Sequence, residues 1–187
     1  MHIEPTEIPG VLVLILKLHE DERGFFTELF NDQCYRDAGI VGPWTQDNLS
    51  RSAKGVLRGL HFQHPHPQGK LVTVLSGSAF DVAVDIRKGS PTFGRWVGRE
   101  LSSTNRHQLW VPPGCAHGFL ALSEDTEIYY KCSHSPWKPS DDRVLRWDDP
   151  DIGINWPMAP TVISNRDLRA PNLAEIDALP LANGDRS

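Results

Sequence analysis

The sequence predicts an all-β domain, and a jelly roll is the natural architecture for a chain of this size. Its 15 glycines and 15 prolines are spread along 187 residues and separate short segments, which is typical of many strands joined by turns. Residues 79–87 alternate with the period of a β-strand. Evidence for helices is thin, so we expect only a few short peripheral ones.

The clearest strand places Phe80, Val82, Val84 and Ile86 on one face, and a Lys-Gly-Ser-Pro turn ends it. We expect residues 71–75 to form its partner strand, with the turn at residues 76–78. The remaining expected strands are residues 11–18, 56–60, 108–111 and 126–132.

Two short helical segments are expected. Asn31 can cap a helix that ends at Gly39, and residues 167–179 hold a second piece that Pro171 interrupts and Pro180 stops. The length fits one domain, which we place at residues 1–181. Residues 182–187 have the composition of a loose polar tail.

The composition excludes several classes of protein. A hydrophobic fraction of 39% and a charged fraction of 23% describe an ordinary globule, not a disordered or collagen-like chain. No window reaches the roughly 18 apolar residues of a membrane span, and the N-terminal residues lack the layout of a secretory signal. A formal net charge of −5 argues against nucleic-acid binding as the main task.

The cysteines Cys34, Cys115 and Cys132 are odd in number and show no C-x-x-C spacing. This pattern favours neither a disulfide framework nor a cysteine zinc site, and it makes a cytoplasmic location the default expectation. Cys115 is expected to be a small buried filler.

Several histidines lie in segments similar to the two halves of the cupin signature, GLHFQHPHPQGKLVTVLSG at 59–77 and LWVPPGCAHG at 109–118. His64 and His66 supply an H-x-H, and His117 ends a P-x-G-x-x-H. A metal cupin needs a Glu where this chain has Lys70, whose ammonium has no lone pair to donate. We therefore expect the double-stranded β-helix without a metal, with His64 and His66 in a solvated proline-rich loop.

His61 follows a strand-like segment that contains Arg58, and Lys70 comes nine residues later. A lone histidine in a strand is more often structural. A histidine, an arginine and a lysine without a metal, however, suit an anionic substrate and proton transfer.

Nearly the whole chain, from about Ile3 to Asp167, resembles the dTDP-4-dehydrorhamnose 3,5-epimerase family of sugar-nucleotide epimerases. The matching blocks are DERGFFTELF, QDNLSRSAKGVLRGLHFQ, QGKLV, FDVAVDIRKGSPTFG, LWVPPGCAHGFLALS, YYKC, RWDDPDIGINWP and SNRD. So many blocks in the same order make the resemblance highly specific.

The resemblance implies a cupin-type jelly roll that works without a metal or organic cofactor. It implies a homodimer whose N-terminal segment reaches the partner's site. The substrate would be a dTDP-linked 4-keto-6-deoxyhexose, and the reaction would invert carbons 3 and 5, both α to the ketone. This converts dTDP-4-dehydro-6-deoxyglucose to dTDP-4-dehydrorhamnose.

The resemblance also implies catalytic roles for four residues. His61 would be the base, Asp167 would hold its tautomer, Lys70 would stabilise charge on the carbonyl oxygen, and Tyr130 would donate a proton from the opposite face. Ile128, Tyr130 and Cys132 share a strand face, so Tyr130 is expected to point inward. The alternative interpretations are a surface carboxylate for Asp167, a surface lysine for Lys70 and a core aromatic ring for Tyr130.

The resemblance implies a further set of substrate-binding residues, each of which can also be read as a solvated polar side chain or a packed ring. They are Arg23, Phe26, Glu28, Gln46, Asn48, Arg58, His117, Trp137 and Arg166. Trp137 departs from the family pattern, which usually has a tyrosine near this position with a spacing that differs by one residue.

Two alternatives remain open at this stage. One is a 3-only or 5-only epimerase, or a keto-isomerase, that acts on a related nucleotide sugar. The other belongs to a different class, a cupin that only binds a sugar or a metal.

Overall fold

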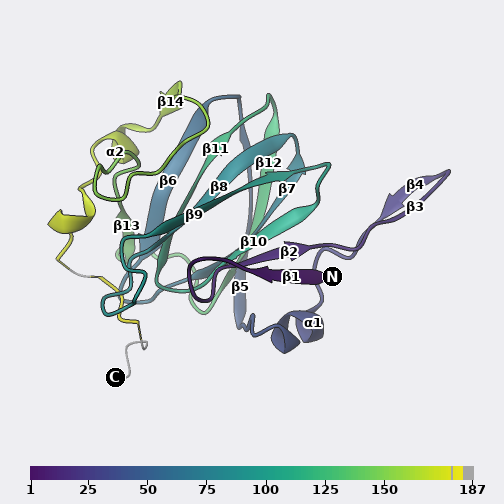
Figure 1. Ribbon diagram of the computed structural model, residues 1–187, viewed down its shortest axis with the longest axis horizontal. Helices are drawn as coiled ribbons and strands as arrows, with labels where there is room; N and C mark the ends of the chain where they lie inside the picture. Colours follow the sequence, from purple (N-terminus) through teal and green to yellow (C-terminus); the bar gives the residue numbers. More distant parts are fainter. Residues whose placement is uncertain (178, 183–187) are drawn as a thin grey trace.

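Two β-sheets that face each other make up most of the fold (Figure 1), in a computed structural model that describes residues 1–177 and 179–182. The first sheet has the strand order β1-β2-β10-β7-β12-β5, and the second has the order β13-β6-β11-β8-β9 with β14 beside β6. The predicted all-β jelly roll is therefore confirmed. No helix in the described part of the chain has the length and apolarity needed to cross a membrane.

The strands of the first sheet are mostly paired with neighbours distant in sequence. Their bounds are β1 His2–Pro5, β2 Leu12–Ile15, β5 Trp44–Ser52, β7 Gly69–Ser76, β10 His107–Val111 and β12 Thr126–Ser133. Those of the second sheet are β6 Val56–Gln63, β8 Ser78–Asp85, β9 Trp96–Ser102, β11 Cys115–Ala121, β13 Asp142–Val144 and β14 Val162–Ile163.

The main hydrophobic core lies between the two sheets. Val72 and Ile128 of the first sheet pack in one buried cluster with Val97, Leu101 and Phe119 of the second. Cys115 belongs to this cluster and is 4% exposed, as expected of a filler. Burial raises its pKa to about 12, which keeps the thiol protonated and inert.

A second core covers the outer face of the second sheet. The apolar face predicted for residues 79–87 packs here, where Val82 and Val84 meet Leu145, Ile152 and Leu173 from the C-terminal part of the chain. The opposite face of β8 is also buried, and it carries Asp81. Alternation identified the strand but did not reveal that both of its faces are covered.

The predicted pairing of residues 71–75 with 79–87 is wrong. These segments form β7 and β8, which lie in different sheets, and β8 pairs with β9 and β11 instead. Gly77 has φ +72°, and a Cβ at this position would lie 2.3 Å from Ser123 Oγ. The turn is therefore a crowded corner at which the chain changes sheets.

The first predicted helix is confirmed and the second is placed differently. The helix α1, Asp32–Asp37, is capped by Asn31, whose side chain accepts a hydrogen bond from the N–H of Cys34. The segment predicted at 167–179 overlaps the end of α2, Asn165–Leu168, and contains a 3₁₀ turn at Leu173–Glu175. The short α2 begins earlier than predicted because Ser164 caps it.

A two-stranded hairpin, β3 His19–Asp21 with β4 Gly24–Phe26, projects from the body of the chain (Figure 1). Its residues are exposed, and Phe26 is 70% exposed. An isolated hairpin is marginally stable in water. Of the predicted polar tail, residues 183–187 lie outside the described residues.

Candidate active site

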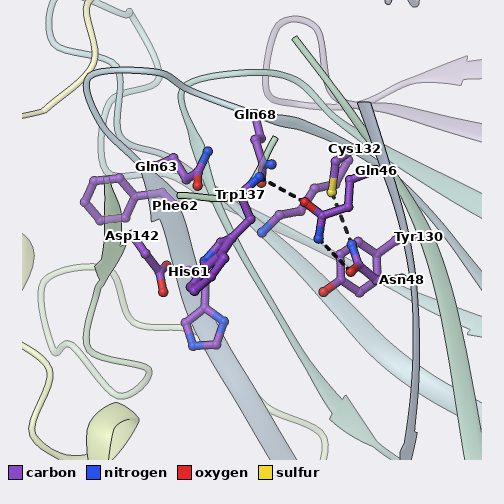
Figure 2. Close-up of a pocket in the computed structure, with 11 residues that line it drawn as sticks. Gln46, Asn48, His61, Phe62, Gln63, Gln68, Tyr130, Cys132, Trp137 and Asp142 are labelled. Atoms are coloured by element: carbon purple, nitrogen blue, oxygen red, sulfur yellow. Dashed lines mark hydrogen bonds between the residues drawn. The ribbon is translucent and has the colours of Figure 1, made fainter. Parts of the chain in front are cut away.

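A pocket of about 240 Å³ lies between strands of the two sheets, and polar side chains line most of it (Figure 2). Its lining residues are Gln46, Asn48, His61, Phe62, Gln63, Gln68, Lys70, Tyr130, Cys132, Trp137 and Asp142. Six of the residues predicted from the sequence therefore share one pocket: Gln46, Asn48, His61, Lys70, Tyr130 and Trp137.

The register of the first sheet explains one wall of this pocket. Asn48 on β5 lies opposite Tyr130 on β12, and Gln46 lies opposite Cys132. Cys132 in turn lies opposite Lys70 on β7. Directly opposed residues share a face of the sheet, so alternate positions of three neighbouring strands form a continuous polar wall.

His61 enters the pocket from the second sheet and is held from behind by Asp167. His61 Nε2 lies 2.8 Å from Asp167 Oδ1, and Asp167 Oδ2 accepts a hydrogen bond of 3.4 Å from the N–H of Gly59. The side chain of His61 is 35% exposed, whereas that of Asp167 is 4% exposed. The dyad thus presents a solvent-accessible imidazole backed by a buried carboxylate.

The electrostatics of Asp167 favour its charged form. Burial works to raise its pKa, but the hydrogen bond and charge interaction with His61 and the Gly59 N–H outweigh burial and leave the pKa below its ordinary value. An ionised Asp167 accepts the Nε2 proton of His61. The tautomer so fixed leaves Nδ1 as the basic nitrogen.

Tyr130 and Lys70 face His61 from the opposite sheet, and Figure 2 shows the imidazole and the phenol on different sides of the pocket. Burial raises the pKa of Tyr130, so its hydroxyl stays protonated. Burial lowers the pKa of Lys70, and the nearby Cys132, Asp142 and Asp81 oppose this shift. The inward orientation predicted for Tyr130 is confirmed.

His117 does not line the pocket. It lies opposite His61 in the β6–β11 register, is 7% exposed at its side chain, and bonds Asp81 Oδ1 through Nε2 at 2.9 Å. Burial lowers its pKa despite Asp81. It packs behind His61 and does not line the pocket itself, so the substrate contact predicted for it stays a prediction.

The histidines of the cupin signature do not converge as metal ligands. His66 bonds Asp141 at 2.7 Å, in a loop that is exposed at His66 as predicted, while His117 bonds Asp81. Within residues 1–177 and 179–182, no three His, Cys, Asp or Glu side chains group as a metal site requires. The donor set of a metal cupin does not fit this chain, since Lys70 replaces the carboxylate.

Two of the three predicted arginines lie beside the pocket. Arg58 and Arg166 line an adjoining hollow of about 380 Å³ with His61 and Asp167. Arg166 Nη1 donates a hydrogen bond of 2.6 Å to Asp142, which does line the main pocket. The two hollows meet at His61, so these guanidinium groups can meet an anionic extension of a ligand bound there.

The predicted residues Arg23, Phe26 and Glu28 are not brought to this pocket. Arg23 and Phe26 lie on the projecting hairpin, and Arg23 is paired with Asp21. Glu28 follows the hairpin and accepts a hydrogen bond from Asn31. Within one chain these residues stay apart from His61.

The sequence did not predict several of the residues that line the pocket. Gln63 and Gln68 border a strand end and a proline-rich loop, where a glutamine is ordinarily a solvated side chain, yet they are only 4% and 8% exposed. Asp142 lies opposite Gln63 in the β6–β13 pairing, which no local pattern indicates. Cys132 was detectable, because it shares a strand face with Tyr130.

The comparisons with known proteins point to one family. The family model described as dTDP-4-dehydrorhamnose 3,5-epimerase matches residues 5–175. An enzyme of that name from Shigella flexneri is 47% identical over 179 residues, which cover 95% of this chain and 98% of the relative. The chain belongs to the dTDP-4-dehydrorhamnose 3,5-epimerase family.

Solved structures of dTDP-sugar epimerases have the same fold. One, the dTDP-6-deoxy-D-glucose-3,5-epimerase of Legionella pneumophila in complex with dTDP-4-keto-L-rhamnose, matches with a TM-score of 0.92 at 47% identity, covering 96% of this chain and 97% of that one. Another, a 3'-monoepimerase of Streptomyces bikiniensis in complex with dTDP-quinovose, matches with a TM-score of 0.90 at 34% identity, covering 98% and 94%.

Proposed function

We propose that the protein is a cofactor-independent epimerase that inverts carbons 3 and 5 of a dTDP-4-keto-6-deoxyhexose, and that its product is dTDP-4-dehydrorhamnose. The observation that carries the proposal is the placement of an Asp-backed histidine and a partly buried tyrosine on opposite sides of one pocket, with a lysine on the strand next to that of the tyrosine. Inversion at a carbon needs a base on one face and an acid on the other.

The first step is removal of an α proton. His61 Nδ1 takes the proton, the C–H electron pair moves into the ring, and negative charge develops on the carbon 4 oxygen as an enolate. Lys70 stabilises that charge, since a fixed ammonium in a pocket acts most strongly where charge develops. Asp167 stabilises the imidazolium that forms.

The second step is delivery of a proton to the opposite face. The raised pKa of Tyr130 keeps its phenol protonated until the enolate forms. Its O–H bond then breaks and a new C–H bond forms from the enolate electron pair. His61 releases to solvent the proton that it took, and the Tyr130 phenolate takes one up. Carbons 3 and 5 are both α to the ketone. One base and one acid therefore serve both carbons when the bound sugar rotates or flips its ring to present each in turn.

Double inversion is favoured over single inversion by the pattern of relatives. The 3,5-epimerases of Shigella and Legionella are 47% identical to this chain, whereas the 3'-monoepimerase is 34% identical. One observation favours the second candidate, a single-carbon epimerase. Trp137, which has no hydroxyl group, lines the pocket where the family resemblance leads one to expect a tyrosine.

The hairpin supports a homodimer as part of the same proposal. Arg23 and Phe26 protrude from the body and cannot serve their own pocket, and Phe26 exposes a large apolar ring. A second copy of the chain would bury this ring and bring a guanidinium to the partner's substrate. We propose that each site is completed in this way.

The test is incubation with dTDP-4-keto-6-deoxyglucose and assignment of the product configuration by NMR, with and without a chelator. We expect inversion at carbons 3 and 5 and the same rate in chelator. Inversion at one carbon only would establish the second candidate. Loss of activity in chelator with recovery on one added metal would overturn the metal-free mechanism, and absence of any conversion would reduce the protein to a binding module.

A further inference from the structure

The segment between β12 and β13 borders the pocket through one side chain. We call residues 134–138 the roof loop. It carries Trp137, whose side chain lines the pocket although the residue is 50% exposed. A loop with no regular hydrogen-bond ladder needs other contacts to hold one position.

Three glutamine side chains supply those contacts, and Figure 2 shows the one between Gln46 and Trp137. Gln68 Nε2 donates to the Ser135 carbonyl at 2.6 Å, and Gln46 Oε1 accepts from the N–H of Trp137 at 2.9 Å. The third glutamine uses both ends of its amide. Gln63 Nε2 donates to the Pro136 carbonyl at 3.3 Å, while Oε1 accepts from the N–H of Lys138 at 2.7 Å.

These bonds connect the roof loop to both sheets. Gln46 belongs to β5 of the first sheet, Gln63 ends β6 of the second, and Gln68 comes just before β7. A buried amide is costly unless it is hydrogen-bonded, and Gln63 and Gln68 are almost fully buried while bonding backbone groups of the roof loop.

The Gln46 amide makes a second hydrogen bond. Its Nε2 donates to Asn48 Oδ1 at 2.8 Å, and Asn48 Nδ2 lies 3.5 Å from Cys132 Sγ. Both ends of the Gln46 amide are therefore engaged within the protein. Its influence on a bound substrate passes at least in part through the roof loop.

We infer that Gln63 and Gln68 are positioning residues that fix the Trp137 indole over the pocket, and that the position of this indole sets how tightly the sugar nucleotide is held. The inference rests on the proposed epimerase function, because it assigns the indole to a dTDP-sugar. The indole offers a flat apolar face, and a face held in place loses less freedom on binding.

A double-mutant cycle tests the inference. Gln68→Leu removes the bond to Ser135, and we expect kcat/KM to fall about tenfold, mainly through a higher KM, as befits loss of about one buried hydrogen bond. In a Trp137→Ala background the same change should lower kcat/KM less than twofold, because the group it positions is gone. An equal loss in both backgrounds would contradict a positioning role.

Gln108→Leu is the matched control. Gln108 is a buried glutamine of the first sheet that bonds Tyr35, Thr73 and the Leu29 carbonyl, away from the roof loop. Its effect should be the same in both backgrounds. Gln63→Glu is a second variant that preserves size and polarity, and it should behave like Gln68→Leu because it loses the donor to Pro136.

An independent readout needs no turnover. In protein labelled with 5-fluorotryptophan, Trp137→Phe identifies one of the six ¹⁹F signals. We expect that signal to shift and broaden in Gln63→Glu and Gln68→Leu; an unchanged signal would overturn the inference. If the wild type does not convert dTDP-4-keto-6-deoxyglucose, the proposed function fails while this readout still decides whether the glutamines fix the indole.

Discussion

The residues of the pocket acquire their protonation states from burial. Lys70 and Tyr130 lie on neighbouring strands, β7 and β12, and burial moves their pKa values in opposite directions. The neutral form is favoured in each case, since removal from water penalises charge. For Tyr130 this keeps a proton available to donate, and for Lys70 it limits the pH range in which the ammonium exists.

Activity should therefore fall on the alkaline side at a pH below the ordinary pKa of lysine. Lys70 loses its charge as pH rises through its lowered pKa, before Tyr130 loses its proton through its raised one. The pH dependence of kcat in the wild type measures this alkaline fall in activity. In Lys70→Arg the fall should move to higher pH, because a guanidinium stays charged. A fall at the same pH would mean that another group causes it.

Tyr130→Phe separates the acid from the base. The change removes one hydroxyl and keeps the ring, so His61 still takes the α proton and Lys70 still stabilises the enolate. We expect inverted product to fall by ~10²–10⁴-fold, as for other general acids, while solvent deuterium still enters with retained configuration. NMR of the recovered sugar distinguishes the two.

An equal loss of deuterium exchange and inversion in Tyr130→Phe would instead assign the residue to substrate positioning. A modest loss of inversion would mean that Tyr130 is a structural aromatic residue, since it packs at the edge of the main core.

At this scale the sequence predicts side chains that follow a strand period and misses those joined by tertiary contacts. Alternation along β12 was enough to point Tyr130 inward. Asp167, by contrast, is separated from His61 by 106 positions, so only family resemblance could pair them. Gln63 and Gln68 gave no signal, because their partners are backbone groups of a distant loop.

Among the elements, β6 and β11 approach each other closely beside the His61–Asp167 dyad. A Cβ at Gly59 would lie 2.6 Å from Gly118 Cα and 2.9 Å from the His117 carbonyl oxygen. Gly59 lies two residues before His61 and has φ +128°, and its N–H donates a hydrogen bond to Asp167. Two glycines thus bring the strands close together where the base is held.

Gly59→Ala should lower the free energy of unfolding by more than a change at an uncrowded glycine. The matched control is Gly89→Ala, which also has a positive φ, +85°, but no atom within 4 Å of the added Cβ. The control should cost about 1–2 kcal/mol, and Gly59→Ala about 1–3 kcal/mol more from overpacking. Urea unfolding at one protein concentration measures both, and equal costs would contradict the crowding argument.

Strand existence was predictable from the sequence, whereas strand pairing was not. The pattern at 71–75 and 79–87 identified β7 and β8, but it favoured a hairpin between them. At Gly77 the chain passes from one sheet to the other, and Ser123 and Thr126 leave no room there for a side chain. Periodicity reports which face is apolar and carries no information about the neighbouring strand.

For the whole molecule, the central question is whether one chain makes a complete site. The pocket contains His61, Lys70 and Tyr130, whereas Arg23 and Phe26 lie on the hairpin that projects from the body of the chain (Figure 1). The resemblance implies that this segment serves the partner's site, and this division between two chains stays a prediction.

Mixing two inactive variants tests the proposed exchange. His61→Asn has a dead pocket and an intact hairpin, while a combined Arg23→Ala and Phe26→Ala variant has the reverse. After joint refolding, half of the dimers should be mixed, each with one complete site, so activity should return to about a quarter of wild type. No recovery, with mixed dimers present by native mass spectrometry, would contradict a shared site.

The most direct test of the account follows deuterium from solvent into carbons 3 and 5 during incubation with dTDP-4-keto-6-deoxyglucose. We expect one deuteron at each carbon with the wild type. In His61→Asn, exchange at both carbons should fall together by ~10²-fold or more, since one base serves both. Exchange that continues at the wild-type rate at either carbon in His61→Asn would show a second base and contradict the mechanism.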